Sequence, residues 1–514
     1  MGLAALTVAA ALVFWVFDAL PFQDLPAHAG LIALRHRLPH SPFEQRFFVL
    51  APSLGPYSLF RFLGDALVQP LGPVGAIRAI ATLPVVATPL VVLWARRTLH
   101  GDRSTAGGYF AIALGFGFMT VLGFASYLLG IAALLAVLTL WLKLLVAADR
   151  GAADAWRWET AIALAAPALF LVHGDAFVVF LGLTAASASS TGQRAARWMR
   201  LRALAPAVTL AAWVAWRERV SALPVGSAPV PHAGFVAHFQ GPFDKLTLII
   251  TPTLITRTGL DAIVAVFLWG VLGGAAVATA RSLGRPRPVP LGATEDDGAI
   301  HARALLVSAV AAFVAFLVLP HSIGWFGFVD GRLVPVVLFL MLLAVRRETL
   351  GGGLLGAAFD RGSVAAATVM VAIAFAASWS FQGEAVGWRE VLHDVPTGAR
   401  LLNLPIEPNS RWFTGHPFVH YDKLALAERP LLVSDVWFHQ GTGLYPTADN
   451  PSLRLPDGYS ESDLRSLDWA SYRLSDWDYA LVRTGVAAVQ PAVPARLTLA
   501  THRGGWWLFR IEAE

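Results

Sequence analysis

Apolar runs of near membrane-spanning length follow one another between residues 2 and 381, separated by short polar segments. An α-helix crosses the bilayer core with about 17–25 apolar residues, and the shorter runs reach this length when their flanks are included. The pattern predicts a polytopic α-helical membrane protein with about 11 transmembrane helices. The expected spans are 2–20, 74–95, 107–123, 125–146, 158–172, 175–190, 203–217, 260–280, 304–320, 332–346 and 364–381.

One further apolar run, Phe47 to Val68, fits this series poorly. Two prolines and two charged residues interrupt it: Pro52, Pro56, Arg61 and Asp65. The run is either a poor span or a helix lying at the membrane surface. Because lipid-exposed charge and proline are unfavourable, we expect it to stay outside the membrane.

Basic residues cluster in alternate loops, which predicts the orientation. Positively charged loops face the cytoplasm, and arginine clusters occur at 96–103, 150–157, 194–202, 281–303 and 346–361. The opposite loops near 124, 173 and 321–331 carry no basic residue. We therefore expect a cytoplasmic N-terminus, large external loops at 21–73 and 218–259, and an external C-terminus.

Residues 383–514 differ in character from the preceding 1–382, because their apolar runs are short and Trp, Pro, Asp and Arg become frequent. The segments 401–406, 431–438, 478–484 and 506–512 are typical of strands, and 461–467 is typical of a helix. We predict a small external α/β domain over 383–514, following a transmembrane domain over 1–382.

Composition supports a membrane protein: 56% of the residues are hydrophobic and only 14% are charged, against about 25% charged in soluble domains. The net charge of +5 follows from the loop arginines, so nucleic-acid binding is not expected. Cysteine is absent, which excludes disulfides, zinc–thiolate sites and a thiol nucleophile. The arginine-rich, lysine-poor usage is typical of a GC-rich bacterium, which predicts the inner (plasma) membrane and a periplasmic C-terminal domain.

The first external loop carries an ordered set of motifs. Asp24 follows the first span, Pro56-Tyr57 opens a juxtamembrane helix, and Leu71-Gly72 ends that helix. Ala76-Ile77-Arg78 lies at the entrance of the second span, and Arg96-Arg97 lies at its exit. This order resembles the C-type (GT-C) membrane glycosyltransferases, especially bacterial relatives of the protein mannosyltransferases and of the lipid A aminoarabinose transferase. Many relatives have two adjacent acids where this chain has Asp24 alone.

The resemblance implies transfer of a sugar from a polyprenyl-phosphate carrier to a glycan, lipid or protein acceptor at the external membrane face. A carboxylate can deprotonate the acceptor hydroxyl or stabilise an oxocarbenium-like transition state. Arginine is well suited to bind the phosphate leaving group. The cofactor question stays open between none and a divalent metal ion, because no metal-ligand spacing is recognised.

Asp24 is the first candidate for the catalytic carboxylate, and Asp18, at the end of the first span, is the second. Asp24 precedes Leu25-Pro26, so it is equally suited to cap a helix. His28 lies one helical turn later and orients Asp24, contacts the substrate or is a plain interfacial residue.

Three residues are candidates for the carrier phosphate: Arg332, His321 and Arg78. The resemblance assigns the phosphate to an arginine before a proline-containing helix, which fits Arg332. The alternatives for Arg332 are an arginine that extends to the interface or an ion pair with Asp330.

Supporting roles are predicted for Tyr57, His173 and Asp175. His173 and Asp175 share a tight external turn, where Asp175 is also an ordinary helix cap. The aromatic, His- and Asp-containing segments 411–423 and 435–445 are suited to acceptor contact, and equally to a Trp-rich core.

The sequence thus predicts a lipid-linked-sugar glycosyltransferase with Asp24 as its carboxylate. A non-catalytic membrane scaffold with the same fold is the first alternative, favoured by the missing second acid beside Asp24. A transporter is the second, and the scarcity of ionisable residues within the spans argues against it.

Overall fold

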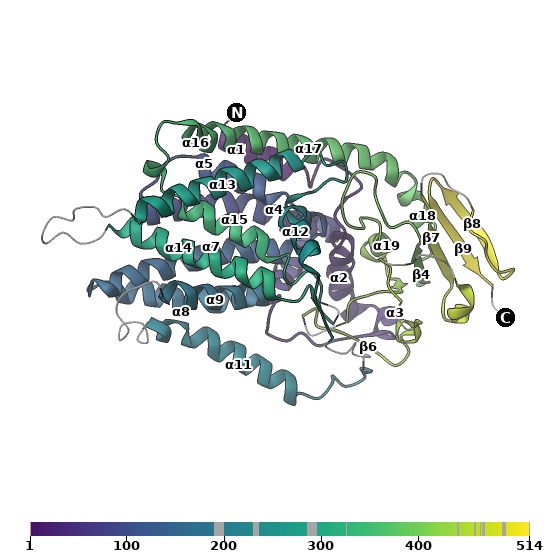
Figure 1. Ribbon diagram of the computed structural model, residues 1–514. Coiled ribbons are helices and arrows are strands. Elements are labelled where there is room, and N and C mark those ends of the chain that lie inside the picture. Colours follow the sequence, from purple (N-terminus) through teal and green to yellow (C-terminus); the bar gives the residue numbers. More distant parts are fainter. Residues whose placement is uncertain are drawn as a thin grey trace, which may run out of the picture.

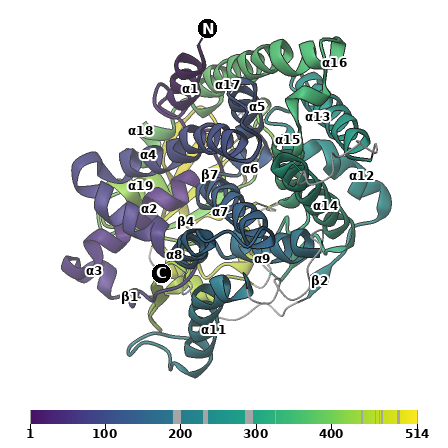
Figure 2. The ribbon, with the colours of Figure 1, turned by 90° about the vertical axis from the view of Figure 1, so that its left-hand side faces the viewer.

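The computed structural model describes residues 2–189, 200–229, 236–284, 296–324, 326–438, 441–456, 459–462, 464, 468–485 and 490–512. Helices make up one end of the molecule, and a β-sheet near the C-terminus lies at the other end (Figure 1). Figure 2 views the molecule from the end opposite the sheet, with the helices in front.

Each of the 11 apolar runs contains a helix in the described residues. Six helical segments are long and apolar enough to cross a membrane: Ser58–His100, Ala125–Asp149, Ala155–Val172, Ala262–Leu283, Asp297–Val318 and Leu354–Ala385. Shorter apolar helices span Leu3–Leu12, Ala106–Gly115, Gly174–Ser189 and Leu333–Ala344. These helices make the chain an integral membrane protein, while the number of about 11 spans stays a prediction.

In chain order the main helices are α1 (Leu3–Leu12), α2 (Leu25–Arg37), α3 (Pro42–Gln45), α4 (Ser58–His100), α5 (Ala106–Gly115), α6 (Phe118–Val121), α7 (Ala125–Asp149), α8 (Ala155–Val172), α9 (Gly174–Ser189), α11 (Ala205–Val220), α12 (Pro242–Ile250), α13 (Ala262–Leu283), α14 (Asp297–Val318), α15 (Leu333–Ala344), α16 (Leu354–Ala357), α17 (Ser363–Ala385), α18 (Trp388–His393) and α19 (Asp422–Glu428).

Helix α4 includes the second half of the ambiguous run at 47–68. It begins after Tyr57 and changes direction at Gly72, whose backbone is extended with a positive φ of 69°. Pro70 and Pro73 flank this point and remove backbone donors, which accounts for a kink rather than a straight helix. The beginning of the run instead contains β1 (Phe48–Leu50).

The C-terminal sheet has the strand order β5-β4-β7-β9-β8. Its strands are β4 (Arg400–Pro405), β5 (Leu432–Val433), β7 (Tyr479–Arg483), β8 (Leu497–Arg503) and β9 (Trp506–Ile511). Strand β4 pairs in parallel with β5 and β7, whereas β9 is antiparallel to β7 and β8. The four segments predicted as strands each overlap one of these strands, and β8 was not predicted. The helix predicted at 461–467 lies largely outside the described residues, and 461–462 form a turn.

Strand pairing and helix packing both tie the first loop to the C-terminal region. Strand β1 pairs antiparallel with β6 (Leu444–Pro446), and α2 packs on α19. A Cβ added at Gly30 of α2 would lie 3.0 Å from the carbonyl oxygen of Lys423, so the two helices approach closely. A second short pair joins β2 (Ala237–His238) to β3 (Ser322–Ile323).

The predicted orientation can be tested by cysteine labelling, because the chain has no native cysteine. Ala448 and Ala153 are both exposed, Ala448 after β6 and Ala153 between α7 and α8. In intact spheroplasts a membrane-impermeant maleimide should label Ala448→Cys and leave Ala153→Cys unlabelled until the membrane is opened. Labelling of Ala153→Cys alone in intact cells would reverse the orientation.

Candidate active site

Asp24 lies where the first loop meets the connection between α6 and α7. The backbone N–H of Gln23 donates to the carbonyl of Val121 at 2.8 Å, and that of Asp24 donates to Leu122 at 3.1 Å. Gly123 has a φ of 77°, and a Cβ there would lie 2.9 Å from the Asp24 nitrogen. Only glycine fits this left-handed, crowded position comfortably, so the connection holds Asp24 in place.

The Asp24 side chain is available for chemistry. It occupies the N-cap position of α2 but makes no capping hydrogen bond, and the residue is 8% exposed. Burial raises the pKa of the Asp24 carboxyl to about 8, with a Gln23 hydrogen bond and the charge of Arg332 acting in the opposite direction and Asp435 adding to the rise. A carboxyl that exchanges its proton near neutral pH is suited to general acid–base catalysis.

Arg332 is buried just before α15 and held on several sides. It forms an ion pair with Asp175, and its guanidinium lies over the rings of Phe326 at 4.0 Å and Phe124 at 4.9 Å. One terminal nitrogen donates to the Gly327 carbonyl at 3.2 Å, while the buried Nε has no hydrogen-bond partner. A fixed guanidinium with a remaining donor is suited to an anionic ligand.

His173 and Asp175, predicted as a pair, lie together beside Arg332. His173 Nδ1 is 3.8 Å from Asp175 Oδ2. The His173 ring packs against Tyr57 and Tyr127, with ring centroids 5.0 and 5.5 Å away. Burial and the charge of Arg332 lower the pKa of His173 to about 3, so the imidazole is neutral.

Tyr57 and Phe328 share an unusual backbone conformation at this site. Their φ angles are 68° and 59°, and no other non-glycine residue in the described part of the chain has a positive φ. Bulky side chains adopt this region at an energetic cost, and such strain is frequent at functional sites. Burial, aided by the charge of Asp175, raises the pKa of the Tyr57 hydroxyl to about 12 and keeps it neutral.

His321 lies near the same loop but contacts different partners. Its Nδ1 is 2.9 Å from Asp330 Oδ1. The fully buried Asp330 also pairs with Lys245, which donates to the Phe316 and Leu319 carbonyls at 3.0 and 2.8 Å. The alternative Asp330–Arg332 pair is absent, because Asp330 pairs with Lys245 and Arg332 with Asp175. Sequence reasoning did not assign a role to Lys245.

Asp18 and Arg78 form a separate cluster after α1. The Asp18 carboxylate is 56% exposed and pairs with Arg389. Arg78 donates to the carbonyls of Trp15, Phe17 and Asp18 at 3.1, 2.9 and 3.0 Å. These contacts hold the segment that follows α1, and none of them involves Asp24 or Arg332.

The His28 ring packs against two aromatic side chains. The ring centroid lies 4.6 Å from that of Phe60 and 5.2 Å from that of Trp437. Trp437 also contacts the ring of His420 at 5.4 Å. His28 therefore helps to join α2 and α4 to the segment after β5.

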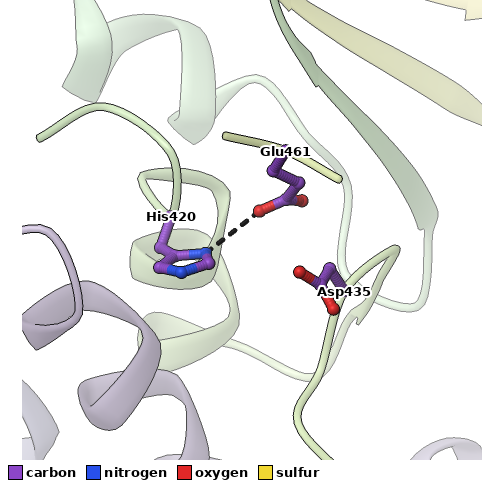
Figure 3. Close-up of side chains that lie close together, drawn as sticks. All are labelled: His420, Asp435 and Glu461. Carbon is purple, nitrogen blue, oxygen red and sulfur yellow. Dashed lines mark hydrogen bonds and ion pairs between the residues drawn. The ribbon is translucent and has the colours of Figure 1, made fainter. Parts of the chain in front are cut away.

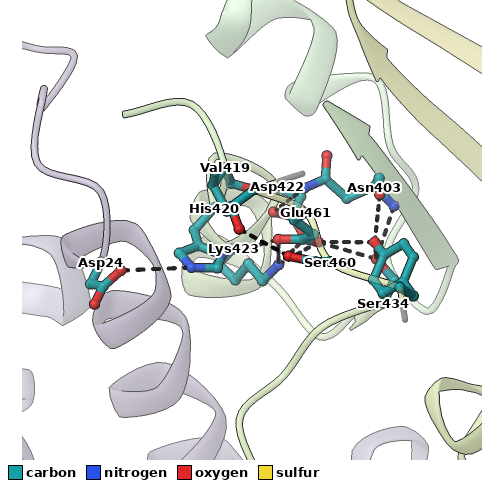
Figure 4. A network of polar contacts seen from close by, with 11 residues as sticks. Asp24, Asn403, Val419, His420, Asp422, Lys423, Ser434, Ser460 and Glu461 are labelled. Atoms are coloured by element: carbon teal, nitrogen blue, oxygen red, sulfur yellow. Dashed lines mark hydrogen bonds and ion pairs between the residues drawn. The ribbon is translucent and has the colours of Figure 1, made fainter. Parts of the chain in front are cut away.

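The C-terminal region brings residues to Asp24 that sequence reasoning did not single out. His420 Nε2 lies 3.7 Å from Asp24 Oδ1, and its Nδ1 lies 3.0 Å from Glu461 Oε2 (Figure 4). Lys423 donates to both Glu461 oxygens, at 2.8 and 2.6 Å. The aromatic composition around 411–423 and 435–445 was the available signal, but it did not identify which polar side chains converge.

One group among the described residues has metal-ligand geometry: His420, Asp435 and Glu461. One ligand atom from each lies within 4.8 Å of the others (Figure 3). If the chain binds a divalent metal ion, these three residues are the candidate ligands.

One solved structure shows which fold this chain shares. The sequence matches no family model and no curated protein. The structure is similar to the crystal structure of ArnT from Cupriavidus metallidurans in the apo state, with a TM-score of 0.52 and 15% identity over 98% of this chain and 97% of ArnT. It also matches the Archaeoglobus fulgidus oligosaccharyltransferase in complex with Zn and sulfate, with a TM-score of 0.44 and 14% identity over 94% of this chain and 67% of that one. The predicted resemblance is therefore confirmed at the level of the fold: this chain has an ArnT-like fold.

Proposed function

We propose that the chain transfers a sugar from a polyprenyl-phosphate carrier to an acceptor hydroxyl at the external membrane face. The observation that carries the proposal is that Asp24, before α2, and Arg332, before α15, are both buried, with the charge of Arg332 acting to lower the pKa of Asp24. The similarity of the whole fold to ArnT supports it. The acceptor is a glycan, a lipid or a protein.

Each residue has a distinct part in the proposed reaction. The Asp24 carboxylate accepts the proton of the acceptor hydroxyl as its oxygen forms the new bond to the anomeric carbon of the sugar. The bond between that carbon and the phosphate oxygen breaks, and the carrier phosphate leaves with the bonding electrons. Arg332 binds this phosphate as its negative charge grows. Asp175 and the surrounding rings hold Arg332 in position.

The remaining Nε donor of Arg332 makes the donor site testable. Arg332→Ala should weaken binding of polyprenyl phosphate roughly ten- to hundredfold, because a lost charge-assisted hydrogen bond costs about 1.5–3 kcal/mol. Arg332→Lys should restore only part, since an ammonium is a point charge that lacks the donors fixed in the plane of a guanidinium. Tryptophan fluorescence of the purified chain, titrated with polyprenyl phosphate, measures the affinity.

Arg202→Ala is the matched control for this titration. Arg202 is an exposed arginine paired with Glu159, so its loss should leave the affinity for polyprenyl phosphate unchanged. Equal affinity of the wild-type chain and Arg332→Ala would remove Arg332 from the phosphate site.

A further inference from the structure

His420, Asp435 and Glu461 converge from three separate segments of the C-terminal region. His420 precedes α19, Asp435 follows β5, and Glu461 lies beyond β6. His420 and Glu461 are 5% and 2% exposed, and Asp435 is half-buried. Figure 3 shows the imidazole and the two carboxylates facing a common centre.

The spacing between two of these groups suits a shared cation. His420 Nδ1 lies 3.0 Å from Glu461 Oε2. Two ligands that each lie about 2.0–2.2 Å from one metal ion are separated by roughly 3.0–3.5 Å in octahedral or tetrahedral geometry. The same distance fits a hydrogen bond when Nδ1 carries a proton, so a metal ion and that proton are alternatives.

Asp435 is the group that distinguishes a ligand site from an ordinary polar core. It makes no hydrogen bond or ion pair with any other residue in the part of the chain that the structure describes. One of its carboxylate oxygens nevertheless lies within 4.8 Å of a ligand atom of His420 and of Glu461. A carboxylate that approaches an imidazole and a second carboxylate without a partner is best explained by a ligand between them.

The charges around the cluster favour a divalent cation. Lys423 forms ion pairs with Asp422 and Glu461, and Asp435 lies beside Glu461. Three carboxyl groups therefore gather around one ammonium group, an arrangement that leaves room for a further cation.

We propose that His420, Asp435 and Glu461 bind one divalent transition-metal ion of the Mn²⁺ or Zn²⁺ kind, for which imidazole and carboxylate are suitable ligands. Ligation through Nδ1 places the remaining ring proton on Nε2, which faces Asp24 Oδ1 at 3.7 Å. Carboxylates that accept from a metal-bound histidine orient the ring. The site does not depend on glycosyl transfer, so it can be tested separately.

The test measures metal uptake by the full-length, untagged chain in detergent. The chain is stripped with a chelator and dialysed against Mn²⁺ or Zn²⁺ in the presence of excess Mg²⁺. The wild-type chain should retain about one ion, and its thermal unfolding should shift to higher temperature on loading. Asp435→Asn should bind at least about tenfold more weakly. Asp449→Asn removes an exposed carboxylate of the same region, 63% exposed, and should bind like the wild type.

Folding of the Asp435 variant can be checked without metal, because Asp435 contributes no hydrogen bond that Asn would break. The metal-free Asp435→Asn chain should therefore still unfold in one cooperative transition. As a second measurement, Cu²⁺-loaded wild-type chain should show imidazole nitrogen coupling in its paramagnetic resonance spectrum, and His420→Gln should lose it. Failure of the wild type to retain an ion, or undiminished uptake by Asp435→Asn, would overturn the site.

Discussion

Asp24→Asn is expected to lower glycosyl transfer by about a hundredfold or more, while binding of polyprenyl phosphate persists. The substitution removes the proton acceptor and keeps the size of the side chain. The Asp24 side chain makes no capping hydrogen bond, and Asn is accepted at the N-cap as well as Asp. Thermal unfolding should therefore change little. Transfer by membranes carrying each variant, normalised to protein level, measures the effect.

Asp18→Asn provides the comparison for this experiment. Asp18 pairs with the exposed Arg389 and has no described contact with Asp24. Full transfer by Asp24→Asn together with a loss in Asp18→Asn would move the catalytic carboxylate to Asp18. Indifference of the reaction to both substitutions would favour the non-catalytic scaffold.

Lys423→Met is expected to cause the largest loss of stability. Burial disfavours the Lys423 charge, but Asp422 and Glu461 outweigh this effect and raise its pKa. Removal of one partner of a buried ion pair costs about 3–5 kcal/mol, because the other charge is left without compensation. Amides of α19 and β4 should exchange with deuterium faster by about two to four orders of magnitude, which mass spectrometry of peptide fragments measures.

The double variant Lys423→Met/Glu461→Gln separates charge imbalance from lost packing. Removing both partners eliminates the uncompensated carboxylate, so the double variant should be destabilised by less than the sum of the single changes. Additive effects of the two substitutions would contradict the ion-pair explanation.

The helical part of the fold could be predicted because apolar composition and helix length are local properties. All 11 runs contain helices, and the strands at 401–406 and 506–512 match β4 and β9 closely. The run at 47–68 was ambiguous because its prolines and charges interrupt the apolar pattern. The structure places a short strand, β1, at its beginning and the first residues of α4 at its end.

Asp24 and Arg332 could be nominated from the sequence because the resemblance assigns roles to those positions. Their neighbours could not. His420 lies roughly 400 residues from Asp24 in the sequence. Tertiary contacts bring the two together, among them the packing of α2 on α19 and the hydrogen bond from Tyr421 to the Leu20 carbonyl. Closeness in the sequence does not determine the ion pairs either. Asp330 pairs with the distant Lys245, and the neighbouring Arg332 pairs with Asp175.

Mass spectrometry of cell-envelope glycans, glycolipids and glycoproteins in a deletion strain tests the proposed transferase most directly, because it requires no prior choice of sugar or acceptor. The strain is complemented with the wild-type chain or with Asp24→Asn at equal protein level. Glycosyl transfer predicts that at least one sugar-bearing species disappears on deletion and returns only with the wild-type chain. An unchanged profile on deletion, or equal restoration by Asp24→Asn, would contradict a transferase that depends on Asp24.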